Sequence, residues 1–307
     1  MPKIAVTAPA FCRSEILCDE LRRIFPELKF NQQGHYLSPS DLIDFLQDAE
    51  GAVIGRDLID ESLLDHLPQL KVIAKYGVGL DNIDQSALKK RGIAFGWTAG
   101  VNKRSVAELT LEFMIGLCHN TFINGFALKQ GQWDKEGGRQ LTGATVGIIG
   151  CGHVGKEVIR LLAPFKCRVL VHDIIDQAEF CASVGATEVS LQDVVEQAEL
   201  LSLHVPLTEL TEGMIDSKVF QQMQKTAYLI NTSRGRVVRQ DDLHAALRDG
   251  IIAGAALDVF SEEPPKGRDF LALPNLMVTP HIGGNTQEAV LAMGRSAIHH
   301  LTKFYQA

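Results

Sequence analysis

Short apolar runs that alternate with amphipathic stretches constrain the fold of this chain more than any other feature of its sequence. Apolar runs at residues 4–7, 52–54 and 71–74 are separated by stretches such as 14–25, whose apolar residues recur with helical spacing. This alternation is typical of βα units, in which helices join parallel strands. The sequence therefore predicts the α/β fold class with parallel sheets.

A second alternating series begins after residue 140 and contains six apolar runs. They lie at residues 145–149, 168–172, 200–204, 227–231, 253–257 and 276–279. Six parallel strands are sufficient for a complete dinucleotide-binding fold. Two long helical patterns, at 105–120 and 286–305, fall outside both series. We expect the first to cross between two domains and the second to pack back on the first domain, since 307 residues exceed what one core usually supports.

The composition excludes several classes of protein. Hydrophobic residues make up 46% of the chain and charged residues 22%, as in globular proteins. The formal net charge of −7 offers nucleic acid no basic surface, and no apolar stretch has the length of a membrane span or the form of a signal peptide. The six cysteines form no C-x-x-C pair. We therefore expect buried reduced thiols, no metal site and a cytoplasmic location.

A glycine-rich loop follows the first run of the second series. Gly150, Gly152 and Gly155 form a G-x-G-x-x-G pattern between the run at 145–149 and a helical pattern at 154–163. Gly150 would allow a tight turn, Gly152 the approach of a pyrophosphate, and Gly155 close packing of the helix. An ordinary strand-to-helix turn is the alternative, but the context favours a dinucleotide site.

An acidic residue stands where this fold recognises ribose. Asp173 ends the next apolar run, and its carboxylate can accept hydrogen bonds from both ribose hydroxyls. A 2′-phosphate would meet that charge, and the neighbours His172, Ile174 and Ile175 supply no permanent cation. We therefore expect NAD rather than NADP as the cofactor, although a solvated carboxylate at a strand end is the alternative.

Three polar residues follow later strands of the second series. Arg234, Glu263 and His281 each come after an apolar run, so the parallel fold places them at the carboxyl edge of the sheet, where ligands bind. Each has a plainer interpretation, as a surface ion-pair member, a loop carboxylate or a capped imidazole. An imidazole near neutral pH can take the proton of a hydroxyl group, and an arginine fork can bind a carboxylate. Together they indicate acid–base chemistry on a small acid.

Seven motifs, in order along nearly the whole chain, resemble the D-isomer-specific 2-hydroxyacid dehydrogenase family. Besides the glycine-rich loop they are Gly77-Val78-Gly79-Leu80-Asp81-Asn82-Ile83-Asp84, Ser105-Val106-Ala107-Glu108, His204-Val205-Pro206, Asn231-Thr232-Ser233-Arg234-Gly235, Asp258-Val259-Phe260 with Glu263-Pro264, and Pro280-His281-Ile282-Gly283-Gly284. The resemblance implies two domains with parallel doubly wound sheets. A Rossmann-type NAD-binding domain, residues 101–283, would be inserted into a flavodoxin-like substrate-binding domain, residues 1–100 and 284–307.

The resemblance also implies roles for individual residues. His281 would be the catalytic acid–base, Glu263 would fix its tautomer, and Arg234 would orient the carboxylate and polarise the 2-oxo group. Backbone amides near Val78 and Gly79 would hold the substrate carboxylate. Asp258 would bind the nicotinamide carboxamide, and the remaining expected cofactor contacts are His153, Val154, His204, Val205, Pro206, Thr232, Ser233, His281 and Gly283. The remaining expected substrate contacts are Lys75, Tyr76 and Arg104.

The side group on the substrate's 2-carbon stays open. We favour 3-phosphoglycerate, the substrate of a serine-biosynthesis reaction, because Lys75, Lys103 and Arg104 lie in expected loops and could supply cations for its phosphate. Glycerate, lactate or a longer acid, and glyoxylate or hydroxypyruvate in the reducing direction, are alternatives. Formate is disfavoured, because the formate dehydrogenases that resemble this family pair the histidine with Gln, and position 263 is Glu.

Three further expectations concern partners and regulation. The chain ends soon after Tyr305, so we expect no C-terminal regulatory domain. Gln132-Trp133 resembles part of the family's dimer contact, which favours a homodimer, although a Trp packed within its own chain is the alternative. An NAD-sensing protein like the transcriptional corepressors that resemble this family is a rival of another class, but the chain has no extended tail for recruiting partners.

Overall fold

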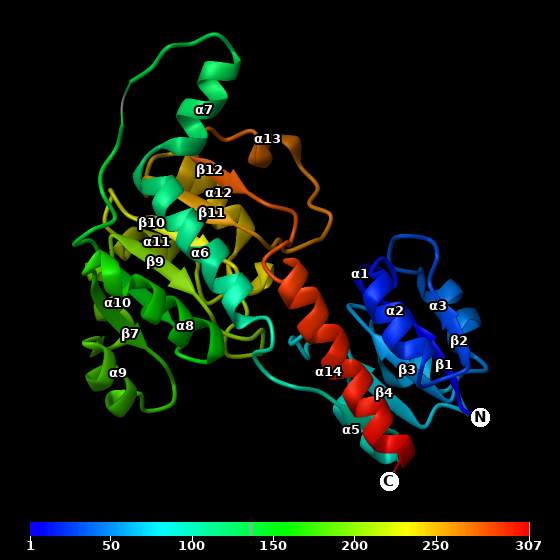
Figure 1. Cartoon of the computed structure of the whole chain (residues 1–307). Helices are drawn as coiled ribbons and strands as arrows, with labels where there is room; N and C mark the ends of the chain where they lie inside the picture. Colours follow the sequence, from blue (N-terminus) through cyan, green and yellow to red (C-terminus); the bar gives the residue numbers. More distant parts are fainter. Residues whose placement is uncertain (136, 307) are drawn as a thin grey trace. The chain divides into compact units, whose positions relative to one another are not determined.

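The chain forms two compact units, shown in a computed structural model that describes residues 1–135 and 137–306 (Figure 1). The first unit comprises Met1–Asn102 with Gly284–Ala307, and the second comprises Lys103–Gly283. The chain leaves the first unit immediately before helix α6 (Lys103–Cys118) and returns shortly before helix α14 (Gln287–Gln306). Each long helix thus belongs to one unit, and the expectation that the first of them crosses between domains is wrong.

The first unit is built on a five-stranded parallel sheet in the order β2-β1-β3-β4-β5. Its strands are β1 (Lys3–Val6), β2 (Glu27–Phe30), β3 (Gly51–Ile54), β4 (Val72–Lys75) and β5 (Ala94–Gly96). The sequence predicted β1, β3 and β4 from their apolar runs. It missed β2, an edge strand that carries Glu27 and Lys29, and β5, which has only three residues.

Each face of this sheet has its own hydrophobic core, because successive strand residues point to opposite sides. Ile4 and Val6 pack with one set of helices, α1 (Pro9–Cys12), α2 (Glu15–Arg22) and α14. Ala5 packs with the other set, α3 (Pro39–Leu46), α4 (Glu61–Leu64) and α5 (Gln85–Lys90). A Cβ on Gly294 of α14 would lie 2.3 Å from Leu17 of α2, so these two helices are in close contact. The predicted packing of the last helix on the first domain is confirmed.

The second unit is built on a seven-stranded parallel sheet in the order β12-β11-β10-β9-β6-β7-β8. Its strands are β6 (Thr145–Ile149), β7 (Arg168–His172), β8 (Thr187–Glu188), β9 (Leu200–Leu203), β10 (Tyr228–Asn231), β11 (Gly254–Leu257) and β12 (Leu276–Val278). All six predicted strands are present, with ends that differ by at most one residue. The seventh, β8, was missed because a two-residue strand leaves no apolar run.

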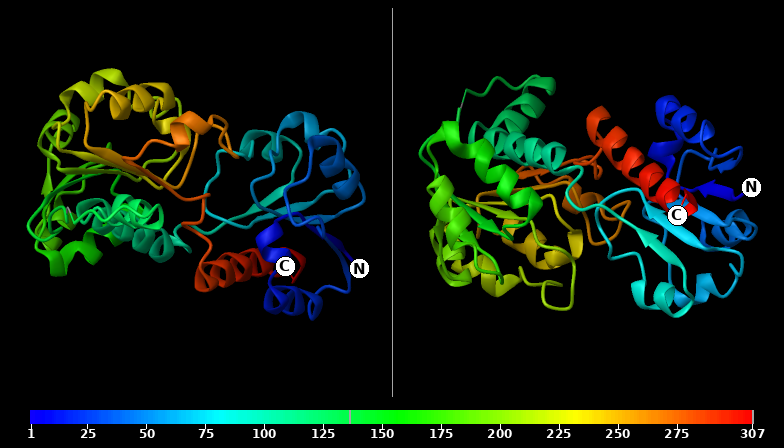
Figure 2. Two further views of the ribbon diagram at one scale, coloured as in Figure 1. Left: turned by 90° about the horizontal axis from the view of Figure 1, so that it is seen from above. Right: turned by 60° about the horizontal axis from the view of Figure 1, so that its bottom comes forward.

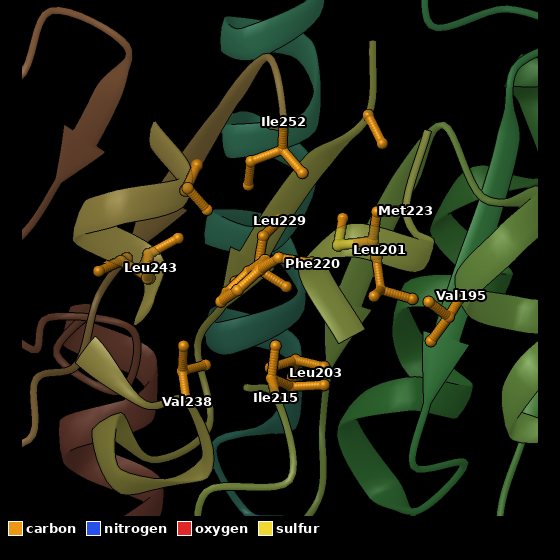
Figure 3. Packing of buried hydrophobic residues seen from close by; sticks show 14 of the residues in the cluster. Val195, Leu201, Leu203, Ile215, Phe220, Met223, Leu229, Val238, Leu243 and Ile252 are labelled. Carbon is orange, nitrogen blue, oxygen red and sulfur yellow. The ribbon is translucent and has the colours of Figure 1, made fainter. Parts of the chain in front are cut away.

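Helices lie on both faces of this second sheet as well (Figure 2). One face is covered by α6, α8 (His153–Leu162) with the short η1 (Ala163–Phe165), and α9 (Ala178–Val184). The other face is covered by α10 (Leu191–Gln197), α11 (Ser217–Gln222), α12 (Gln240–Arg248) and α13 (Arg268–Leu271). In this second core Phe220 of α11 lies among Leu201, Leu229 and Leu243 (Figure 3). Both sheets are therefore doubly wound, as predicted.

Helix α7 (Thr121–Lys129) buries none of its residues, unlike the other α-helices within residues 1–135 and 137–306. It stands away from the sheet of the second unit (Figure 1). Phe122, Phe126 and Leu128 of this helix are exposed, and so is Trp133 in the segment after it.

Disulfides, membrane-spanning helices and metal sites would each leave a recognisable arrangement of residues in the structure. All six cysteines are free, and those at 18, 118, 151 and 181 are buried, as expected, whereas Cys12 and Cys167 are half-buried. No helix in residues 1–135 or 137–306 has the length and apolarity needed to cross a membrane. The same part of the chain has no cluster of three or more His, Cys, Asp or Glu side chains arranged to hold a metal ion.

Candidate active site

The glycine-rich loop joins β6 to α8, and its glycines meet different steric demands. Gly150 has φ +95°, and a Cβ there would lie 2.7 Å from the carbonyl group of His204. A Cβ on Gly155 would lie 2.1 Å from the carbonyl oxygen of Gly150, so the start of the helix packs directly on the loop. By contrast, nothing lies within 4 Å of a Cβ built on Gly152, the N-cap residue of α8. The loop therefore leaves space at the helix N-terminus that fits a pyrophosphate.

Asp173 directly follows β7 and is bonded to the glycine-rich loop. Its Oδ2 accepts a hydrogen bond from the backbone N–H of Cys151 at 2.6 Å, and its Oδ1 accepts one from Ile175 at 2.9 Å. Carboxylate oxygens can accept further hydrogen bonds. The loop thus holds this half-buried carboxylate at the place that the fold uses for ribose recognition.

His204 follows β9 on the other side of the glycine-rich loop. Its Nε2 lies 2.9 Å from the hydroxyl of Ser202. Loss of water around the ring lowers the pKa of His204 to about 3. The ring is therefore neutral near pH 7, and this residue brings no positive charge to the loop.

The loop that carries Arg234 is shaped by a buried asparagine at the end of β10. Asn231 donates through Nδ2 to the carbonyl of Arg234 at 2.9 Å, and its Oδ1 accepts from the backbone N–H and the hydroxyl of Ser233, at 3.0 and 2.8 Å. Gly235, which opens the short η2 (Gly235–Val237), lies so close to Phe260 that a Cβ would be 1.9 Å from its carbonyl carbon. The arginine loop is therefore packed on the loop that follows β11.

His281 and Glu263 form a hydrogen-bonded pair. The Nδ1 of His281 lies 2.8 Å from Oε2 of Glu263, and Oε1 of the same carboxylate accepts from the backbone N–H of Phe260 at 3.1 Å. The side chains are 30% and 16% exposed, so solvent screens the pair less than a surface ion pair. His281 has φ +55°, a left-handed conformation that is uncommon for a residue with a side chain. Such strain persists where surrounding contacts enforce it, often at functional sites.

Asp258 enforces this turn from the end of β11. Its side chain is buried, and Oδ1 accepts from the hydroxyl of Thr279 at 2.6 Å and from the N–H of Ile282 at 2.7 Å. Its Oδ2 accepts from the N–H of Gly283 at 2.8 Å. Burial raises the pKa of Asp258, and these three donors oppose that rise. The carboxylate thus holds the backbone on either side of His281, a role that the sequence did not indicate.

The substrate-binding residues expected in the first unit surround the end of β4. Lys75 is only 4% exposed, and its ammonium donates to the carbonyl of Gly55 and to Oδ1 of Asn82. Tyr76 is also buried, whereas Val78 and Gly79 are half-buried. Lys75 was expected in a loop, and that expectation is wrong because it is the last residue of a strand. Its contact with substrate stays a prediction.

The two other expected cations also lie outside loops. Lys103 and Arg104 are the first two residues of α6, so the prediction of a loop is wrong for both. Arg104 is bonded to Glu108 at 2.6 Å and to Glu157 at 3.3 Å, both within the second unit. Its contact with substrate likewise stays a prediction.

The second unit brings Arg234, Glu263 and His281 together, because the loops that carry them follow the adjacent strands β10, β11 and β12. The residues expected to bind the cofactor all lie in this unit, at Gly150, Gly152, His153, Val154, Gly155, Asp173, His204, Val205, Pro206, Thr232, Ser233, Asp258, His281 and Gly283. Lys75, Tyr76, Val78 and Gly79 belong to the first unit. Sequence reasoning missed the supporting roles of Asn231, which lies inside a matching motif, and of Thr279, which directly precedes one.

Comparison with known proteins identifies the family. A family model described as D-isomer specific 2-hydroxyacid dehydrogenase, NAD binding domain, matches residues 111–283. D-3-phosphoglycerate dehydrogenase of Methanocaldococcus jannaschii is 33% identical over 312 aligned positions, which cover 99% of this chain and 57% of that protein. The chain thus spans little more than half the length of that relative.

Two further proteins match over most of both chains. Glyoxylate reductase of Thermofilum pendens is 37% identical over 273 positions, which cover 86% of this chain and 80% of its own. The structure of D-lactate dehydrogenase from Aquifex aeolicus, complexed with NAD and lactic acid, has a TM-score of 0.86 and 26% identity, and covers 99% of this chain and 95% of its own. This chain therefore belongs to the D-isomer-specific 2-hydroxyacid dehydrogenase family, and residues 111–283 are its NAD-binding domain.

Proposed function

We propose that this protein catalyses NAD-dependent hydride transfer at the 2-carbon of a small D-2-hydroxy acid. The observation that carries the proposal is the bond between His281 Nδ1 and Glu263, which fixes the ring so that Nε2 is the nitrogen that exchanges a proton with the substrate hydroxyl. A positioned acid–base next to a dinucleotide fold is what this reaction requires.

Each group of the site has a part in the reaction. NAD, which the glycine-rich loop and Asp173 would hold, would supply the hydride acceptor for oxidation and, in its reduced form, the hydride donor for reduction. In oxidation His281 takes the hydroxyl proton as the hydride leaves, and Glu263 stabilises the imidazolium that forms. In reduction His281 gives the proton to the 2-oxygen. Arg234 orients the carboxylate and polarises the carbonyl, and the amides of Val78 and Gly79 bind the same carboxylate.

The open space at Gly152 and the carboxylate of Asp173 support this use of the cofactor. The N-terminus of α8 faces that space and favours the negative charge of a pyrophosphate. Asp173 accepts hydrogen bonds from the ribose hydroxyls and disfavours a 2′-phosphate. We infer a preference for NAD over NADP on this basis.

The substrate we propose first is 3-phosphoglycerate, supported by relatives named D-3-phosphoglycerate dehydrogenase. A specific observation favours glyoxylate or hydroxypyruvate as the second candidate. Lys75 is buried and Arg104 is ion-paired, so two of the cations expected for a phosphate are engaged elsewhere, and several relatives are named glyoxylate reductase.

A spectrophotometric assay of NADH oxidation across a panel of 2-oxo acids tests these proposals. The panel contains 3-phosphohydroxypyruvate, hydroxypyruvate, glyoxylate and pyruvate, with His281→Asn as the inactive control. We expect turnover that the control lacks, and the ranking of kcat/KM identifies the side group. An absence of turnover with every acid, despite tight NADH binding, would favour the nucleotide-sensing alternative instead.

We also propose that the protein is a homodimer that associates through α7. The exposed side chains Phe122, Phe126, Leu128 and Trp133 lie on or just after a helix that buries nothing, and large apolar patches of this kind usually mark interaction sites. Light scattering after size exclusion should give a dimer for the natural chain and a monomer for Phe126→Glu. Leu210→Glu, which changes an even more exposed apolar residue elsewhere in the second unit, should remain a dimer.

A further inference from the structure

A closed network of hydrogen bonds lies at the carboxyl edge of the first unit's sheet. The buried ammonium of Lys75 donates to the carbonyl of Gly55 and to Oδ1 of Asn82, the latter at 2.8 Å. The Nδ2 of Asn82 in turn donates to the same carbonyl of Gly55 at 3.2 Å and to that of Asp57 at 2.6 Å. A lysine ammonium is rarely buried, because its loss of water is costly unless polar groups replace it. The network therefore calls for an explanation beyond packing.

The network fixes both ends of one segment, residues 76–81, which we call the amide loop. Lys75 precedes this loop and Asn82 follows it, and both are bonded to the segment after β3. The carbonyl of Asn82 also accepts from the N–H of Ile59 at 2.8 Å. At the middle of the loop, the indole N–H of Trp97 donates to the carbonyl of Val78 at 3.1 Å. Hydrogen bonds of Lys75, Asn82 and Trp97 thus hold the amide loop at its two ends and its middle.

Two backbone N–H groups of the amide loop are available to bind a ligand. Within residues 1–135 and 137–306, the N–H groups of Val78 and Gly79 have no hydrogen-bond acceptor. Gly77 has φ +114°, a conformation that favours glycine and turns the backbone at the start of the loop. Successive unpaired N–H groups on a turned backbone form a concave site for an anion. The ammonium of Lys75, close by in the sequence and shielded from water, adds a positive field to that site.

We propose that Lys75 and Asn82 are positioning residues, which hold the amide loop in the shape that receives the substrate carboxylate. This inference rests on the proposed function, in which those amides bind the carboxylate. In this proposal both side chains act through the loop, which replaces the direct contact of Lys75 with substrate that the sequence predicted. Lys75 acts through the loop and through its charge, not as a direct phosphate ligand.

The test compares Asn82→Leu with a matched control in the same unit. Asn31 is likewise buried, and its Nδ2 donates to two carbonyls, those of Thr7 and His35, at 2.9 and 2.8 Å, without a bond to the amide loop. Asn31→Leu therefore removes a similar bridge elsewhere. We expect Asn82→Leu to raise KM for the best 2-oxo acid by about tenfold or more, with Kd for NADH unchanged, whereas Asn31→Leu lowers stability and leaves KM within about twofold of the natural enzyme.

Two additional variants keep the test decisive if Asn82→Leu fails to fold. Lys75→Met removes the charge but keeps the volume, and should raise KM in the same way. Asn82→Asp retains the acceptor for Lys75, and should recover part of the lost affinity. If Lys75→Met raises KM no more than Asn31→Leu, the network only ties the segment after β3 to β4, and the proposal is wrong.

A binding measurement separates this proposal from the proposed function. Trp97 is bonded to the amide loop and is one of only two tryptophans in the chain, so in a Trp133→Phe background its fluorescence reports on the loop. We expect oxamate, an unreactive 2-oxo acid analogue, to change this signal in the presence of NADH, and Lys75→Met to weaken oxamate about tenfold. If oxamate binds but no acid is turned over, the proposed function fails, while the comparison with Lys75→Met still tests the positioning role. If oxamate binds equally well to Lys75→Met, only the positioning role is wrong.

Discussion

The bond between His281 and Glu263 should make the two residues act as one catalytic unit. Replacing His281 with Asn removes the group that exchanges the proton, and a positioned acid–base usually contributes about 10²–10⁴ in rate. Replacing Glu263 with Gln keeps a hydrogen-bonding partner but removes the charge that favours the imidazolium. A charge-assisted hydrogen bond in a half-buried setting contributes about 1.5–3 kcal/mol, so Glu263→Gln should lower kcat about 10- to 150-fold.

The double variant distinguishes a unit from two independent contributions. Without the imidazole, Glu263 has no proton transfer to support, so His281→Asn with Glu263→Gln should be little slower than His281→Asn alone. Steady-state kcat and kcat/KM for 2-oxo acid reduction measure this, with NADH Kd as the check that the cofactor site is intact. Glu262→Gln is the matched control, because the exposed Glu262 pairs with Lys266 instead and should not affect kcat. A double variant that shows the product of the two single losses would refute the coupling.

Three more predictions follow from the cofactor domain. Asp173→Ser should weaken NAD binding by about 1.5–3 kcal/mol while NADP improves relative to it, and a natural enzyme that already prefers NADP would contradict the assignment. Gly155→Ala should lower the free energy of unfolding by about 1–3 kcal/mol, because its Cβ meets the carbonyl oxygen of Gly150. Gly152→Ala should leave the melting temperature nearly unchanged but raise the Kd for NADH about tenfold. Equal effects of the two variants on NADH binding would contradict the assignment of the open space at Gly152 to the pyrophosphate. The pKa of His204 is about 3 in the folded protein and about 6.5 in the unfolded chain, so the free energy of unfolding should fall by about 1.4 kcal/mol per pH unit below pH 6.5. Denaturant unfolding at pH 7 and pH 5 measures this slope. His204→Gln should make the slope smaller.

The sequence predicted those features of the fold that are encoded locally. The strand β6, the glycines after it and the helix α8 stand within twenty residues, and each leaves its own signal in the order of residue types. Strand β8 left none, because its two residues, Thr187 and Glu188, are too few to form an apolar run. The main residues of the candidate site were also predicted from local signals. The positions of Arg234, Glu263 and His281 follow from strand ends and from the family motifs, since parallel strands all end at one edge of a sheet.

What the sequence did not predict depends on contacts between distant segments. The left-handed backbone of His281 is enforced by Asp258, more than twenty residues earlier, and no pattern near either residue shows that bond. Lys75 was expected in a loop, where it could supply a cation for a phosphate. Its burial follows from Gly55 and Asn82, which supply oxygen atoms only once the segment after β3 lies beside the loop after β4.

The two ends of the second unit lie side by side, which bears on how this domain is inserted into the chain. The hydroxyl of Ser105 donates to the carbonyl of Gly283, so the first turn of α6 and the last residue of the unit are bonded to each other. In the first unit, a Cβ on Gly284 would lie 2.9 Å from the side chain of Asn102, so its two cut points are adjacent as well. The cofactor domain is therefore an inserted domain whose first and last residues are neighbours, and insertions of this kind are readily tolerated. A short linker from residue 102 to 284 would close the first unit around its own sheet, with α14 still packed on β4.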